Sequence, residues 1–154
     1  GPDVPGDDIL FGEHFPTASG RARIVPARVL VPPDEVPDAD YPLVLTTGRL
    51  LEHWHTGAMT RRSGVLDAIE PEGLAAMHPA EIRRRGLTAG STVTVETRRG
   101  AITARLRADR EVAEGMVFVP FAFNEAAANR LTNPKLDPFG KIPEFKFAAA
   151  RVTG

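Results

Sequence analysis

Hydrophobic and polar residues alternate in residues 92–106, and this pattern predicts a β-hairpin. Val93 and Val95 alternate with threonine and glutamate, and Ile102, Ala104 and Leu106 alternate with polar residues on the return. The Arg-Arg-Gly sequence between the two runs supplies a tight turn. A period of two places one face of each strand in the core, so we predict two antiparallel strands joined by this turn.

Unbroken apolar runs predict buried strands elsewhere in the chain. Residues 43–46 are bounded by Pro42 and Gly48, and residues 115–123 are entered through Gly115. Residues 145–152 form a last run. A short helix is predicted after His78, which is a plausible N-cap, and it ends at Gly86.

Prolines interrupt the remaining sequence and favour loops over long regular elements. Residues 124–145 begin with a possible helical turn and are then broken by prolines and a glycine, which predicts an ordered loop. Short strands with few helical turns predict a mainly β fold, an all-β barrel with small helical insertions. The barrel domain is expected over residues 41–154.

Residues 1–40 are rich in proline, glycine and acidic residues, which predicts an extended arm with one short strand at Ala22–Val25. A plain linker and an arm that packs on a larger body both fit this composition. The sequence starts with Gly1-Pro2 and without methionine, so we expect a piece of a longer protein.

Composition excludes several function classes. The net charge of −1 provides no global basic field for nucleic acid. The absence of cysteine excludes disulfides, thiol nucleophiles and cysteine-ligated iron–sulfur clusters in this chain. No apolar run has the length of a membrane span. We therefore expect neither nucleic acid as a partner nor membrane insertion; a cytoplasmic location is the prediction, with the periplasm as the alternative.

The stretch LTTGRLLEHWHTGAMTRRS, residues 45–63, carries the candidate chemistry. If residues 52–56 are extended, His53 and His55 point to one side and form half of a zinc site. A hydrolase is the weaker hypothesis, because Ser63 has neither a Gly-x-Ser-x-Gly motif nor an obvious acid–base partner. Threonine hydroxyls, arginine forks and Trp54 suit a nucleotide with a pyrophosphate. A solvated basic loop beside a core tryptophan also fits.

The segments YPLVLTTGRLLEHWHTGAMTRRS and ANRLTNPKLDPFGKIPEFKFAAARV resemble the C-terminal molybdopterin-dinucleotide-binding domain of formate dehydrogenase large subunits. GRARIVPA resembles the lead-in to that domain. The resemblance covers nearly all of the chain from about Phe11. It implies a double-psi β-barrel and a bis(molybdopterin guanine dinucleotide) cofactor with molybdenum or tungsten.

The resemblance also implies the site residues. Phe121 corresponds to a position near the substrate channel. The cofactor-contacting positions are Thr47, Gly48, Arg49, His53, Trp54, His55, Thr56, Arg61, Arg62, Asn129 and Lys146. Each also has a structural interpretation, such as a core position for Trp54 or a surface position for Lys146.

In the family, the catalytic residues and the cysteine or selenocysteine that ligates the metal belong to other domains. This chain is therefore expected to bind the cofactor without turnover of its own, in a parent that oxidises formate to carbon dioxide. The implied partners are the remaining domains of the parent subunit and electron-transfer subunits. Three alternatives stay open: a nitrate reductase parent, a related molybdenum oxidoreductase of another substrate, and a stand-alone, non-catalytic barrel that binds a ligand.

Overall fold

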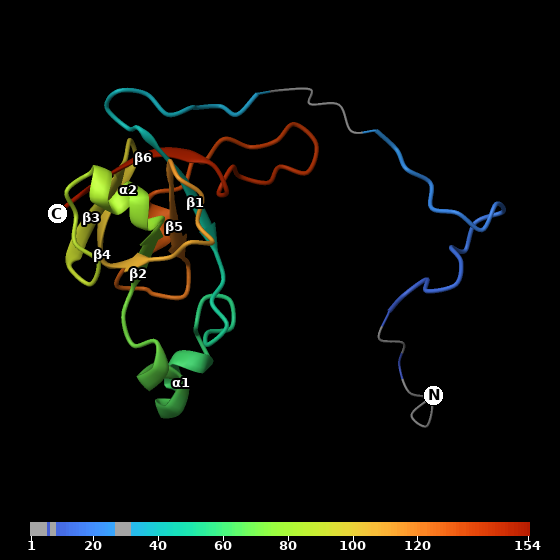
Figure 1. Ribbon diagram of the computed structural model, residues 1–154, viewed down its shortest axis with the longest axis horizontal. Helices are drawn as coiled ribbons and strands as arrows, with labels where there is room; N and C mark the ends of the chain where they lie inside the picture. The colour runs from blue at the N-terminus through green and yellow to red at the C-terminus, as the bar shows by residue number, and fades with distance from the viewer. Residues whose placement is uncertain (1–5, 7–8, 27–31) are drawn as a thin grey trace. The chain divides into compact units, whose positions relative to one another are not determined.

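The computed structural model describes residues 6, 9–26 and 32–154 (Figure 1). The chain divides into two units, Gly1–Pro32 and Pro33–Gly154. The described part of the first unit contains no helix or strand. It includes a compact turn in which the N–H of Phe15 donates to the carbonyl oxygen of Gly20 at 3.0 Å.

The short strand predicted at Ala22–Val25 is wrong. These residues have no strand partner within the described ranges, and the side chains of Ile24 and Val25 are exposed. A β-branched run becomes a strand only when a neighbour satisfies its backbone groups and covers one face. Pro26 follows directly and has no N–H to offer such a neighbour.

The second unit begins at Pro33, earlier than the boundary predicted after residue 40. Glu35 gives the physical reason. Its carboxylate accepts hydrogen bonds from the guanidinium of Arg99, at 2.6 and 2.8 Å, and from the N–H of Ala149 at 2.6 Å. The hydrogen bonds from Arg99 hold the pKa of Glu35 below its ordinary value. The segment is therefore tied to the barrel although it forms no regular element.

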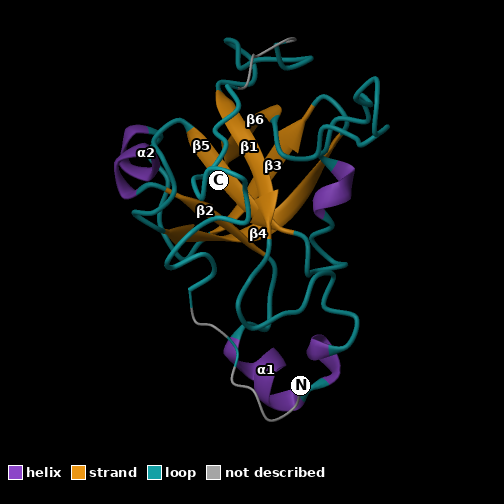
Figure 2. Ribbon diagram, turned by 90° about the vertical axis from the view of Figure 1, so that its right-hand side faces the viewer, coloured by secondary structure: helices purple, strands orange, loops and turns teal. Residues whose placement is uncertain are grey.

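Six strands of the described residues close into a barrel, shown in orange in Figure 2, in the order β1-β5-β2-β4-β3-β6. Their bounds are β1 (Leu43–Gly48), β2 (Leu74–Met77), β3 (Thr92–Thr97), β4 (Gly100–Ala108), β5 (Met116–Pro120) and β6 (Ala148–Thr153). β1 pairs in parallel with β5, and β2 in parallel with β4; the other pairs are antiparallel. The mainly β, double-psi barrel expected from the sequence is confirmed.

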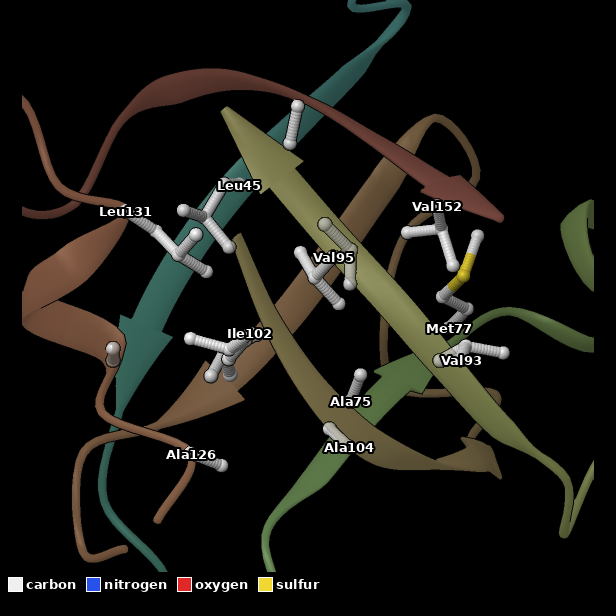
Figure 3. Packing of buried hydrophobic residues seen from close by; sticks show 14 of the residues in the cluster. Leu45, Ala75, Met77, Val93, Val95, Ile102, Ala104, Ala126, Leu131 and Val152 are labelled. Carbon is white, nitrogen blue, oxygen red and sulfur yellow. The ribbon is translucent and has the colours of Figure 1, made fainter. Parts of the chain in front are cut away.

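The predicted hairpin is confirmed as β3 and β4, with Val95 opposite Ile102 and Thr97 opposite Gly100. Val93, Val95 and Ile102 are buried inside the barrel, where side chains from several strands meet (Figure 3). This alternation follows from the pleat, which points successive side chains to opposite faces of a strand.

The sequence did not predict β2, whose four residues are all buried. A short run with two alanines has no alternation and weak strand propensity, so only its neighbours β4 and β5 define it. The final strand starts at Ala148 instead of residue 145, and the carbonyl oxygen of Phe145 accepts a hydrogen bond from the hydroxyl of Thr47 instead of pairing with a strand.

The helices are short: η1 (Thr60–Arg62), α1 (Gly64–Ile69), α2 (Pro79–Arg84) and η2 (Ala128–Arg130). The start of α2 is confirmed, since His78 is its N-cap and its Nδ1 accepts a hydrogen bond from the N–H of Ala80 at 3.1 Å. The helical turn expected near the start of residues 124–145 corresponds to η2. No helix of the described residues is long and apolar enough to cross a membrane.

Candidate functional site

Two chain segments start side by side at one end of the barrel. β1 and β5 are parallel, so their carboxyl ends lie together, with Gly48 opposite Pro120. The N–H of Phe121 donates to the carbonyl oxygen of Gly48 at 3.2 Å. Residues 49–73 then leave the barrel and carry α1 away from it (Figures 1 and 2). This arrangement brings the first motif next to the segment that follows β5.

Phe121 lies at the centre of a group of basic side chains. The guanidinium carbon of Arg49 and the Nζ of Lys146 each lie 5.8 Å from the centroid of its ring. The imidazole of His55 approaches the same ring, with 6.4 Å between centroids. Arg49 is exposed, and no described residue accepts a hydrogen bond from it. Two cations from distant parts of the sequence therefore share one aromatic neighbour, and one of them keeps its donors available.

A cavity of about 160 Å³ lies beside this ring. Thr56 and Asn129, which come from the two separate motifs, both line it. Its other lining residues are Phe121, Phe123, Asn124, Ala127 and Ala128. The cavity is thus lined by hydroxyl and amide groups together with apolar side chains, which is the composition of many ligand pockets.

Thr47 has a structural role at the end of β1. It is buried, and its hydroxyl donates to the carbonyl oxygen of Phe145 at 2.7 Å. Its own carbonyl oxygen accepts a hydrogen bond of 2.5 Å from the Nζ of Lys146. Both contacts fix the start of the final segment against β1, and they place the ammonium group of Lys146 next to Phe121.

His53 is an interior residue with 1% of its surface exposed. Its Nε2 lies 2.7 Å from the carbonyl oxygen of Glu70, and its Nδ1 lies 3.3 Å from the hydroxyl of Thr60. A carbonyl oxygen only accepts, so Nε2 carries a proton and donates it to Glu70. Both ring nitrogens have protein partners, and the ring packs edge-on against Phe123. His53 therefore holds together the connection between β1 and β2 by binding Thr60 and Glu70.

Residues 52–56 are not extended, which overturns the geometry of the two-histidine zinc hypothesis. His55 has a left-handed φ of 49° and packs on Trp54, with 4.8 Å between ring centroids, while His53 is buried. No group of three metal-binding side chains occurs in the described part of the chain. Trp54 itself is 65% exposed, so it is not a core residue.

Arg61 is fully engaged within the protein. Its guanidinium donates to both carboxylate oxygens of Glu125 at 2.7 Å, to Asp67 at 3.1 Å and to the carbonyl oxygen of Pro71 at 3.2 Å. It also lies over the ring of Phe123, 4.9 Å from the centroid. Burial alone would raise the pKa of Glu125, but the hydrogen bond and the charge of Arg61, together with a backbone hydrogen bond, lower the pKa overall. Arg61 therefore links the connection after β1 to the segment after β5, which contains Glu125.

The structure thus separates the predicted site residues into two sets. Arg49, His55, Thr56 and Lys146 approach the ring of Phe121 or the adjoining cavity, together with Asn129. Thr47, His53 and Arg61 are used in internal contacts, Gly48 packs against Phe118, and Trp54 and Arg62 are exposed. Asn124 also lines the cavity, but it was not predicted from the sequence. Its position as the first polar residue after the apolar run of residues 115–123 could have indicated it.

Comparisons with known proteins identify the family of the barrel. Residues 43–149 match the family described as "Molydopterin dinucleotide binding domain". The F420-dependent formate dehydrogenase 1 subunit alpha of Methanococcus maripaludis is 43% identical over 148 residues, and the F420-dependent formate dehydrogenase subunit alpha of Methanocaldococcus jannaschii is 42% identical over 147 residues. Each alignment covers 96% of this chain and 22% of the relative.

The same fold occurs in a solved structure. Acetylene hydratase from Pelobacter acetylenicus matches with a TM-score of 0.67 at 23% identity, over 73% of this chain and 18% of that chain. This likeness shows the fold alone. The chain spans about a fifth of the length of the curated relatives it matches. On its sequence match over the barrel, the chain belongs to the molybdopterin dinucleotide-binding domain family.

Proposed function

We propose that this domain holds the dinucleotide part of a bis(molybdopterin guanine dinucleotide) cofactor within the large subunit of a formate dehydrogenase. The observation that carries the proposal is the approach of Arg49 and Lys146 to one ring, that of Phe121, beside the cavity lined by Thr56 and Asn129. The family supports the cofactor class, and the names of the relatives favour formate over nitrate as the substrate of the parent.

The donor groups fit a nucleotide that carries a diphosphate. An arginine fork and a lysine ammonium replace water around phosphate oxygens, and an exposed Arg49 has donors to give. The amide of Asn129 and the hydroxyl of Thr56 suit the polar edge of a base. A cavity of about 160 Å³ is smaller than pockets that enclose a whole drug-sized ligand, which hold about 300–1,000 Å³. It would therefore hold one group of the cofactor, with Thr56 and Asn129 as its polar partners.

The cofactor supplies the redox chemistry, the two-electron oxidation of formate to carbon dioxide at molybdenum or tungsten. This domain contributes binding and orientation. The chain has no cysteine, so a cysteine or selenocysteine ligand to the metal comes from elsewhere in the parent. The remaining domains of the parent subunit are its immediate partners, and electron-transfer subunits receive the electrons. The isolated chain is expected to be inactive.

The test uses the full-length subunit with Arg49→Ala and Lys146→Met. Each change removes one charge-assisted contact, which should weaken cofactor retention by about tenfold or more. We expect less guanine nucleotide and less molybdenum or tungsten per polypeptide after gel filtration. Arg83→Ala, an exposed cation on α2, is the matched control. Normal nucleotide and metal content in both site variants would contradict the proposal.

The alternatives call for different measurements. Activity of the holoenzyme with formate and without nitrate reduction separates the two parent reactions, and activity with neither points to another substrate. A stand-alone binding module would have a native mass close to that of this chain, whereas a domain of a large subunit would have several times that mass. A cytoplasmic location is tested by cell fractionation of the native protein.

A further inference from the structure

Asn133 is a buried polar residue that the binding site does not use. Only 5% of its surface is exposed. Its Nδ2 donates to a carboxylate oxygen of Asp34 at 3.0 Å and to one of Glu144 at 3.3 Å, and its Oδ1 accepts from the N–H of Lys135 at 3.0 Å. One amide therefore joins three chain segments, and three of its four hydrogen-bonding directions are used.

The contacts of Asn133 close the loop that carries Lys146. Within this loop, the N–H of Glu144 donates to the carbonyl oxygen of Lys135 at 2.9 Å, and Leu136 and Pro143 form an isolated bridge. Two residues beyond Glu144 lies Lys146, whose Nζ donates to Thr47. The position of the ammonium group thus depends on a loop whose base is held by Asn133.

The other end of the connection is the segment of residues 33–38, which we call the strap. Asp34 lies on the strap and also donates its N–H to Glu144 at 3.3 Å. The next residue, Glu35, is bound by Arg99 and by the N–H of Ala149. The strap is therefore anchored to the barrel at Glu35 and to the loop at Asp34, with Asn133 between the two carboxylates.

Charge explains why an amide suits this position. The carboxylates of Asp34 and Glu144 both face the same Nδ2, and like charges this close repel unless donors lie between them. Lys135 compensates only in part, since its Nζ is exposed and 3.6 Å from Asp34. An aspartate in place of Asn133 would be nearly isosteric but would add a third carboxylate and remove the two donated hydrogen bonds.

We infer that Asn133 is a positioning residue: by joining the strap to the loop of residues 133–146, it holds Lys146 beside Phe121 in the geometry that the cofactor requires. This inference rests on the proposed function of Lys146. It assigns a role to the strap as well, because the strap supplies one of the two carboxylates that Asn133 binds.

The experiment compares Asn133→Asp with the double variant Asn133→Asp/Glu144→Gln in the full-length subunit. The double variant returns the cluster to two carboxylates and one amide. Two properties are measured: hydrogen exchange of the amides in residues 142–146, and guanine nucleotide content. Asn133→Asp should speed exchange by about tenfold, as expected for a lost hydrogen bond to a charged group, and lower the nucleotide content. The double variant should restore at least half of each loss.

Two further variants make the result decisive. Asp34→Ala changes only the strap and should shift both properties in the same direction, so it serves if Asn133→Asp does not fold. Lys141→Ala at the tip of the same loop, where Nζ donates only to the carbonyl oxygen of Pro138, should change neither. Unchanged exchange in Asn133→Asp and Asp34→Ala, a lower nucleotide content without faster exchange, or no restoration in the double variant would each overturn the inference.

The proposed function fails separately. If Arg49→Ala and Lys146→Met retain the cofactor, the site itself is wrong, whatever the exchange of the loop shows. If those two variants lose the cofactor while a loosened loop in Asn133→Asp retains it, the binding site stands and only the positioning role of Asn133 is refuted.

Discussion

The ring of Phe118 on β5 occupies the space into which a side chain on Gly48 of β1 would project. A Cβ built on Gly48 would overlap this ring, with the Cζ atom only 2.9 Å away. Thr46 is opposite Phe118 and Gly48 is opposite Pro120, so Gly48 and Phe118 are diagonal neighbours across the parallel pair. Gly48 does not have a positive φ. Packing between strands therefore explains this glycine without a ligand.

Gly48→Ala should destabilise the barrel by about 1–3 kcal/mol, because the added methyl group forces the Phe118 ring or the β1–β5 pairing to shift. The measurement is the urea unfolding midpoint of the chain. The double variant Gly48→Ala/Phe118→Leu should recover most of the loss, since a smaller side chain leaves room for the methyl group. Equal destabilisation with and without Phe118→Leu would show that the clash is not the cause.

Arg61→Ala should destabilise the fold by about 1–3 kcal/mol, because it leaves Glu125 and Asp67 without their shared partner. Arg61→Lys should recover little of this loss, since one ammonium group cannot replace three guanidinium nitrogens that donate separately to Glu125, Asp67 and Pro71. Unfolding of Arg61→Ala, Glu125→Ala and the double variant Arg61→Ala/Glu125→Ala measures the coupling. Additive effects of the two single changes would mean that the ion pair contributes nothing.

Glu81 should make the free energy of unfolding depend on pH in the acidic range. Its side chain is fully buried, which alone would raise its pKa, but the N–H of Gly115 at 3.0 Å and the guanidinium groups of Arg85 and Arg84 lower it overall. The unfolded state then binds a proton at a higher pH than the folded state does. The stabilisation is present at neutral pH, and it is lost as the pH falls from the ordinary glutamate range through the lowered pKa.

Glu81→Gln should cost about 1.5–3 kcal/mol at pH 7 and reduce the acid dependence of unfolding, since the charged acceptor is gone. Urea unfolding at neutral and acidic pH gives both quantities. Glu111→Gln, at an exposed position, is the control and should leave the profile unchanged. A profile for Glu81→Gln that is parallel to that of the unchanged chain would contradict the role of Glu81.

Local patterns in the sequence were sufficient where neighbouring residues determine the structure. The hairpin of β3 and β4 follows from alternation and a tight turn, and α2 follows from the cap at His78 and the proline after it. These features depend on contacts within a few residues, so the sequence displays them directly. The two motifs that resemble the family also lie in the sequence itself, which is why the sequence alone indicates the fold class and the cofactor class.

The tertiary structure decided which residues of the motif are available to a ligand. His53, Trp54 and His55 are consecutive, yet the first is buried with both ring nitrogens bonded, the second is exposed and the third faces Phe121. A left-handed turn at His55 sets these directions, and no periodicity predicts it.

Residue type also does not show that Arg49 is available to a ligand while Arg61 is bound within the protein. The two residues have the same chemistry and the same basic surroundings in the sequence, but Glu125, which binds Arg61, comes from the segment after β5. Lys146 likewise donates to Thr47, which lies 99 positions earlier in the sequence. The sequence determined the barrel and the chemical groups at its end, whereas long-range ion pairs and strand pairing, formed only when the barrel closes, decided which groups are left to bind.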